Sequence, residues 1–197
     1  MVECGATCLA AEFGWHTLCV VRTHMVKEVS LTIIVHHLLK TFEPFNIGVA
    51  LAGVTRLVVA RVAIVLADEA ALKSLFEFKG ASGILPCPLC SNVILRSSEL
   101  HEFDGSLKPH SVTSLEGCVQ HTDDSVVAII RRLRAQKGVL TKKKFEDLQK
   151  SLGFNFVADG ILDGEVLGIT SLHFDWAHCV LIQGTFHIEA HVHNIWF

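Results

Sequence analysis

The sequence contains no tyrosine, few charged residues and no excess of basic ones. Only 19% of its 197 residues are charged, half are hydrophobic, and the formal net charge is -3. The high apolar content excludes a disordered chain. The negative charge excludes a global basic field that would attract nucleic acid, so any contact with DNA must be local. The length suffices for one ordinary domain with a hydrophobic core.

The first residues also lack a basic segment followed by an apolar one. We therefore expect no signal peptide and an intracellular, reducing environment. In that environment, clustered cysteines indicate a metal ion rather than disulfides. The chain has seven cysteines, an odd number.

The longest apolar stretch, residues 47–67, matches the length of a membrane span. Arg56 and Arg61 interrupt it, and each would be costly at the centre of a bilayer. We therefore expect two shorter buried segments and no lipid partner. A membrane-associated protein is the alternative, which the mean hydropathy of +0.44 favours.

Hydrophobic patterning predicts a mixed α/β chain. Trp15–Arg22 and Leu57–Ala67 are rich in β-branched residues and are predicted strands, the second of them buried and central. Asp68 follows at once and can cap a helix that ends at Phe78. Val29–Thr41 fits either a helix or a strand. Two further amphipathic helices are predicted over residues 125–136 and 141–152.

Asp68 is the first residue with possible chemistry. An aspartate at the carboxyl end of a central strand is where α/β nucleases place a ligand for Mg²⁺, and two such ions stabilise the attacking and leaving oxygens. Taken alone, this residue fits a plain helix cap better.

The sequence Cys87-Pro88-Leu89-Cys90 places two thiols at the right spacing to bind one ion. A structural zinc takes four such ligands in a tetrahedron. A redox pair is the alternative, but no thioredoxin-like pattern surrounds the motif, so zinc is favoured. Six residues are open as the other two ligands: His101, His110, Cys118, His121, His173 and His178.

Two short patterns remain. Asp175 and His178 are three residues apart, and a carboxylate beside a ligating histidine is a common pairing around metals. The only dense basic run lies within residues 131–144 and fits either a solvated helix face or a phosphate-contacting surface. Its main residues are Arg131, Arg132, Arg134, Lys142, Lys143 and Lys144.

The order of these motifs resembles that of eukaryotic DDE DNA transposases of the CACTA type and the relatives of the V(D)J recombinase. Their RNase H-like core has a catalytic aspartate that ends a strand and precedes a helix. A CxxC motif and an Asp/Cys-x-x-His signature follow, and then a last catalytic glutamate. Here Asp68, the glycine-rich turn at residues 79–83, Cys87 with Cys90, and Asp175 with His178 occur in that order.

The resemblance implies structural zinc held by Cys87, Cys90, His173 and His178, with Asp175 beside them. It makes Asp68 a relic Mg²⁺ ligand. The family needs three carboxylates, yet no aspartate precedes Asp68, and Glu189 is the only carboxylate residue after His178.

We therefore expect a transposase-derived fragment without catalytic activity that retains zinc binding and weak DNA binding. Mg²⁺ would bind only if a catalytic site survives. The implied location is the nucleus. Residues 1–80 would form a partial RNase H-like core, and residues 81–197 a zinc-knuckle insertion with a helical and C-terminal segment. The alternatives are a small zinc-stabilised interaction module and a translated gene fragment without function.

Overall fold

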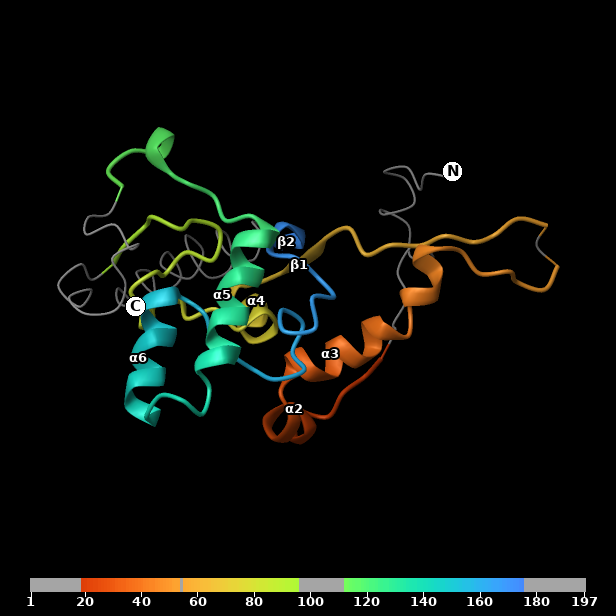
Figure 1. Cartoon of the computed structure of the whole chain (residues 1–197). Coiled ribbons are helices and arrows are strands. Elements are labelled where there is room, and N and C mark those ends of the chain that lie inside the picture. Colours follow the sequence, from red (N-terminus) through yellow and green to blue (C-terminus); the bar gives the residue numbers. More distant parts are fainter. Residues whose placement is uncertain (1–18, 54, 96–111, 176–197) are drawn as a thin grey trace, which may run out of the picture. The chain divides into compact units, whose positions relative to one another are not determined.

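The computed structural model describes residues 19–53, 55–95 and 112–175. The chain forms two compact units, Met1–Ser30 and Leu31–Phe197. In the first unit the described residues contain one helix, α2 (Thr23–Val29). The second unit contains all the other elements (Figure 1).

The described part of the chain is a mixed α/β structure with five α-helices and two parallel strands, which confirms the predicted class. The elements of the second unit are, in chain order, α3 (Leu31–Lys40), η2 (Glu43–Asn46), β1 (Val65–Ala67), α4 (Glu69–Phe76), η3 (Gly80–Ser82), η5 (Leu115–Gly117), α5 (Asp123–Gln136), α6 (Lys142–Leu152), η6 (Ile169–Ser171) and β2 (Leu172–Phe174).

The two strands form a parallel pair. Val65 lies opposite Leu172, and Ala67 lies opposite Phe174. One residue further on, the amide of Asp175 donates to the carbonyl oxygen of Ala67 at 2.9 Å. Because parallel strands end at the same edge of a sheet, Asp68 and Asp175 leave the sheet side by side.

The helices begin and end where local side-chain chemistry predicts. Asp68 caps α4, since its Oδ1 accepts from the amide of Ala71 at 2.7 Å. Thr122 and Ser125 form a reciprocal capping box at the start of α5. Thr141 caps α6, and Gly153 ends it at a φ of +79°, a conformation that glycine adopts easily. These three predicted helices are confirmed, and the ambiguous segment 29–41 is the helix α3.

One face each of α4, α5 and α6 packs into the main core. Leu72, Phe76 and Leu133 are fully buried there, together with Phe154 and Ile161. Residues on both sides of position 80 contribute, so the predicted domain boundary at residue 80 lies inside the second unit.

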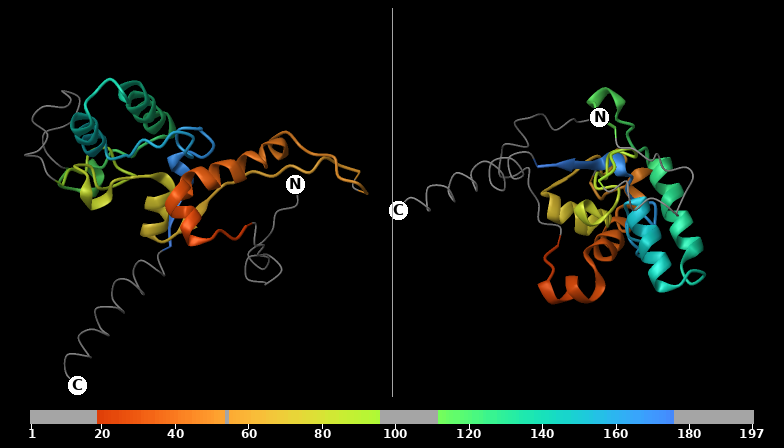
Figure 2. Two further views of the ribbon diagram at one scale, coloured as in Figure 1. Left: turned by 90° about the horizontal axis from the view of Figure 1, so that it is seen from below. Right: turned by 90° about the vertical axis from the view of Figure 1, so that its left-hand side faces the viewer.

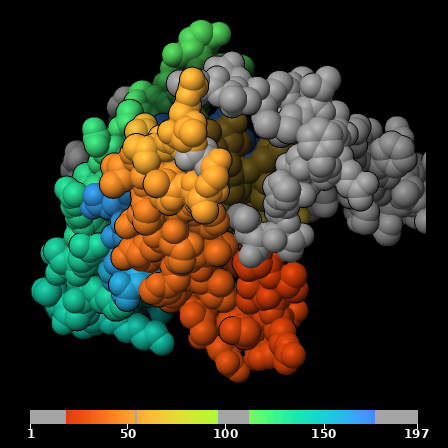
Figure 3. Space-filling model, turned by 90° about the vertical axis from the view of Figure 1, so that its right-hand side faces the viewer, coloured from red at the N-terminus to blue at the C-terminus, as the bar shows by residue number. Residues whose placement is uncertain are grey.

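The prediction of a buried central strand over Leu57–Ala67 is wrong for most of its length. Only Val65–Ala67 form a strand, and the rest lies on the surface. The views agree that residues 47–53 and 55–64 project away from α4, α5 and α6 (Figures 1 and 2), and Figure 3 shows these orange-to-gold residues on the outside. The exposed apolar side chains are Leu57, Val59, Val62, Ile64 and Leu66.

The reason lies in strand pairing. Apolar β-branched residues become buried only where neighbouring strands and helices cover them. Within the described residues, β1 pairs with β2 alone. The preceding segment forms an isolated antiparallel bridge between Val49 and Val58, and the amide of Ala60 donates to the carbonyl oxygen of Phe45 at 3.1 Å.

The first half of the other predicted strand, Trp15–Arg22, lies outside the described residues, and its last four residues belong to no strand. The alternative of a membrane span over 47–67 finds no helix to support it. In the part of the chain that the structure describes, every helix is too short or too polar to cross a bilayer.

Candidate metal centre

The CxxC motif lies in a loop that is fastened to the end of α6. The amide of Ile84 donates to the carbonyl oxygen of Lys150 at 2.9 Å, and the amide of Leu95 donates to the carbonyl oxygen of Ile84 at 2.8 Å. Ile84, Leu85 and Ile94 form a small buried cluster of their own. Three apolar side chains bury little surface, so this loop needs further support to hold one conformation.

Part of that support comes from residues 117–121, which run antiparallel to residues 89–92. Cys90 and Gln120 form the central bridge. The amide of Ser91 donates to the carbonyl oxygen of Val119 at 2.9 Å, and the amide of His121 donates to that of Leu89 at 2.8 Å.

Asn92 ties the same two segments together with its side chain. Its Nδ2 donates to the carbonyl oxygen of Gly117 at 2.7 Å, and its Oδ1 accepts from the amide of Val119 at 2.9 Å. The side chain is buried. These contacts fix the backbone on both sides of Cys118.

The result is a cluster of three thiols, Cys87, Cys90 and Cys118, referred to below as the thiol cluster. The Cys90 thiol has both Cys87 and Cys118 as hydrogen-bonding neighbours, and burial together with these neighbours raises its pKa to about 12. All three are free cysteines and half-buried. Three soft sulfur donors in contact are a donor set that zinc prefers.

His121 lies next to the thiol cluster in the chain and is buried. Its Nδ1 lies 3.0 Å from the hydroxyl oxygen of Ser125. Its ring meets that of Phe154 edge-on, with 5.9 Å between centroids. Burial lowers the pKa of His121, so the imidazole is neutral at pH 7, which is the form that binds metal ions.

The histidines that the resemblance implies lie elsewhere or outside the described residues. His173 is an exposed residue of β2, where it pairs with Leu66 and contacts the carbonyl oxygen of Ser171. His178 lies outside the described residues, as do His101, His110 and Glu189. Within the described ranges, no group of three or more histidine, cysteine, aspartate or glutamate side chains is placed so that it could hold a metal ion.

Asp68 and Asp175 form a second feature, at the carboxyl ends of β1 and β2. Asp68 is the cap of α4, and both residues are half-buried. Their positions are those at which a parallel sheet of an α/β nuclease would hold Mg²⁺. The sequence predicted a role for each residue but did not predict that they lie together.

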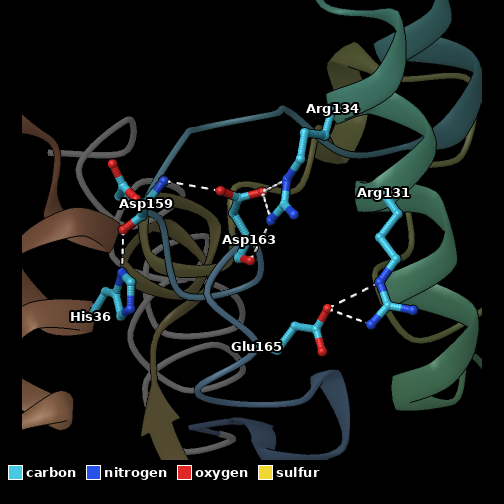
Figure 4. A network of polar contacts seen from close by, with 6 residues as sticks. All are labelled: His36, Arg131, Arg134, Asp159, Asp163 and Glu165. Carbon is cyan, nitrogen blue, oxygen red and sulfur yellow. Dashed lines mark hydrogen bonds and ion pairs between the residues drawn. The ribbon is translucent and has the colours of Figure 1, made fainter.

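Two of the predicted DNA-binding arginines have partners within the protein (Figure 4). Arg131 forms an ion pair with Glu165 at 2.7 Å, and Arg134 contacts both the side chain and the backbone carbonyl of Asp163. The same loop is fastened to α3, because the Nδ1 of His36 bonds to the carbonyl oxygen of Asp159. The arginines therefore hold the loop 159–165 against α5.

Lys142, Lys143 and Lys144 lie elsewhere, in the first turn of α6, and all three are exposed. A cation at a helix N-terminus opposes the helix dipole, at a cost of about 0.3–1 kcal/mol each. Arg132 is exposed on α5.

No family model matches this chain, and comparisons with curated proteins and with solved structures find no match.

Proposed function

We propose that this chain is a transposase-derived protein without strand-transfer activity, whose retained property is the binding of one structural zinc ion through Cys87 and Cys90. The thiol cluster is the observation that supports zinc binding best. Two segments far apart in the sequence bring Cys118 to the CxxC motif. The small cluster of Ile84, Leu85 and Ile94 beside it gives such an ion a structural role.

The placement of Asp68 supports the transposase ancestry. In the family, a catalytic aspartate ends a strand and precedes a helix, and Asp68 lies between β1 and α4. The family needs three carboxylates, and the resemblance places Asp175 beside the zinc ligands and outside that set. Because no aspartate precedes Asp68 in this sequence, we expect no strand transfer.

Zinc content tests this proposal. We expect the purified full chain to carry about one equivalent of zinc by elemental mass spectrometry. A variant with Cys87→Ser and Cys90→Ser should carry less than about a tenth of that, because two of four ligands are lost. Cys19→Ser, which changes an exposed cysteine outside the thiol cluster, is the matched control and should keep its zinc. A folded wild-type chain without zinc would refute the proposal.

A weak, sequence-independent contact with DNA is the second proposed property, and the first turn of α6 is the surface that favours it. The lysines there lie where a helix N-terminus already attracts phosphate. In contrast, Arg131 forms an ion pair with Glu165, and Arg134 forms one with Asp163.

Salt-dependent binding to a short duplex tests this property. Replacing Lys142, Lys143 and Lys144 with alanine should weaken binding and lower the slope of log K against log salt by about one unit per lost phosphate contact. An Arg131→Ala, Arg134→Ala variant removes two charges instead of three and should change this slope little, because these arginines already pair with Glu165 and Asp163. Equal slopes for the wild type and the lysine variant would contradict this role for α6.

A further inference from the structure

We propose that the zinc ion is held by three thiolates and one imidazole, from Cys87, Cys90, Cys118 and His121. This inference rests on the proposed zinc binding and specifies its ligands. It replaces the histidines that the transposase resemblance implies with two residues from the segment that crosses the CxxC loop.

The site has two halves, the pair Cys87 and Cys90 and the pair Cys118 and His121, and both pairs have the same spacing. Cys87 and Cys90 are separated by two residues, and so are Cys118 and His121. Structural zinc sites commonly combine two such ligand pairs, and three cysteines with one histidine form one of the usual sets.

The backbone pairing brings the two halves together. In an antiparallel pair, side chains alternate between the faces, so Cys118 lies on the same face as Gln120 and therefore as Cys90. A tetrahedral ion with zinc–sulfur bonds of about 2.3 Å separates two sulfur ligands by about 3.8 Å. Cys90 has both Cys87 and Cys118 as hydrogen-bonding neighbours, so its sulfur lies near both of the other sulfur ligands.

His121 is the fourth ligand, which the repeated spacing assigns. In this structure its ring packs against Phe154, and its Nδ1 lies 3.0 Å from the Ser125 hydroxyl oxygen. Because side chains alternate along an extended segment, His121 lies on the opposite face from Cys118 and Cys90. Coordination therefore requires the backbone at Gln120 and His121 to twist and the ring to leave Phe154 and Ser125.

The charges of the proposed zinc complex can be counted. One Zn²⁺ displaces three thiol protons to the solvent and accepts a lone pair from neutral imidazole, which leaves a complex with a net charge of -1.

Zinc affinity and cobalt spectra of the full chain test the ligand set. Cys118→Ser and His121→Ala should each weaken zinc binding by at least about a hundredfold, more than the 10- to 100-fold loss for residues that only support a ligand. Cys19→Ser and His24→Ala change exposed residues of the same types and should bind zinc like the wild type.

Cobalt(II) replaces zinc and reports thiolates through its sulfur-to-metal charge-transfer band. Cys118→Ser should lower this band by about one third, since two of three thiolates remain. His121→Cys should bind cobalt and raise the band by about one third, because four thiolates then bind the ion in place of three. A variant that fails to fold could not produce this gain. In the wild type, zinc should shift the NMR signals of the Phe154 ring.

The outcomes separate the two proposals. If the wild type binds one zinc and Cys118→Ser, His121→Ala and His121→Cys match it in affinity and in cobalt spectrum, this ligand set is wrong and zinc binding stands. Loss of zinc from His173→Ala instead would assign the site to the residues that the resemblance implies. A wild type without zinc would refute both proposals.

Discussion

Removing zinc with a chelator is expected to lower the hydrogen-exchange protection of residues 84–95 and 117–121 by about a thousandfold. An ion that binds only the folded loop, at a free concentration a thousand times its Kd, stabilises it by about 4 kcal/mol. The amides to monitor are those of Ser91 and His121, whose hydrogen bonds join the two segments of the site. The small apolar cluster of Ile84, Leu85 and Ile94 is too limited to replace that free energy.

The middle of α5 provides the internal control. Val126, Ile130 and Leu133 belong to the main core, so the amides of this helix should keep most of their protection after chelation. Unchanged protection at Ser91 and His121 would show that no ion stabilises the loop. The Cys87→Ser, Cys90→Ser variant should exchange as the chelated wild type does, with or without added zinc.

Replacing Phe76 with alanine is expected to lower the free energy of unfolding by about 3–5 kcal/mol. The side chain of Phe76 is fully buried in the core that α4, α5 and α6 share. Its removal loses apolar contacts and leaves a cavity. In a chain of this size, a loss of that magnitude lowers Tm by about 6–20 °C.

Val139→Ala is the matched control for this change, since it also removes apolar atoms but from a side chain that is 74% exposed. It should alter the free energy of unfolding by less than about 0.5 kcal/mol. Thermal or urea unfolding monitored by circular dichroism measures both variants. If Phe76→Ala were as stable as Val139→Ala, the arrangement of α4 in the core would be wrong.

The helices were predictable because the residues that define them are close together in the sequence. Asp68, Thr122 and Thr141 cap helices whose apolar stripes repeat at the helical period, and Gly153 ends one of them. Each signal needs only its neighbours within a few residues. The segment 29–41 stayed ambiguous because its apolar residues also fit a strand, and packing against the core decides between the two.

The strand over Leu57–Ala67 was mispredicted because strand formation depends on partners distant in the sequence. A run of valine, isoleucine and leucine indicates burial, but local sequence does not specify what covers it. Only Val65–Ala67 find a partner, in Leu172–Phe174, and this pairing joins residues far apart in the chain. The preceding residues keep their apolar side chains exposed.

In the candidate site too, local signals were predictable and contacts between distant segments were not. The CxxC spacing identified Cys87 and Cys90 locally, whereas the sequence left Cys118 among six possible partners. Its place beside Cys90 follows from the bridge between Cys90 and Gln120 and from the side-chain contacts of Asn92, which join distant segments. The repeated spacing in Cys118-x-x-His121 was the one local signal that pointed to this pair.

The cap on α4 gives Asp68 a role that does not depend on catalysis. Its carboxylate satisfies the Ala71 amide, and replacing an N-cap aspartate with alanine typically costs about 1 kcal/mol. Selection for a folded chain would therefore retain this residue whether or not it ever binds a metal ion. A search that identifies nuclease sites by an aspartate between a strand and a helix would count this position as evidence of activity, although folding alone explains it.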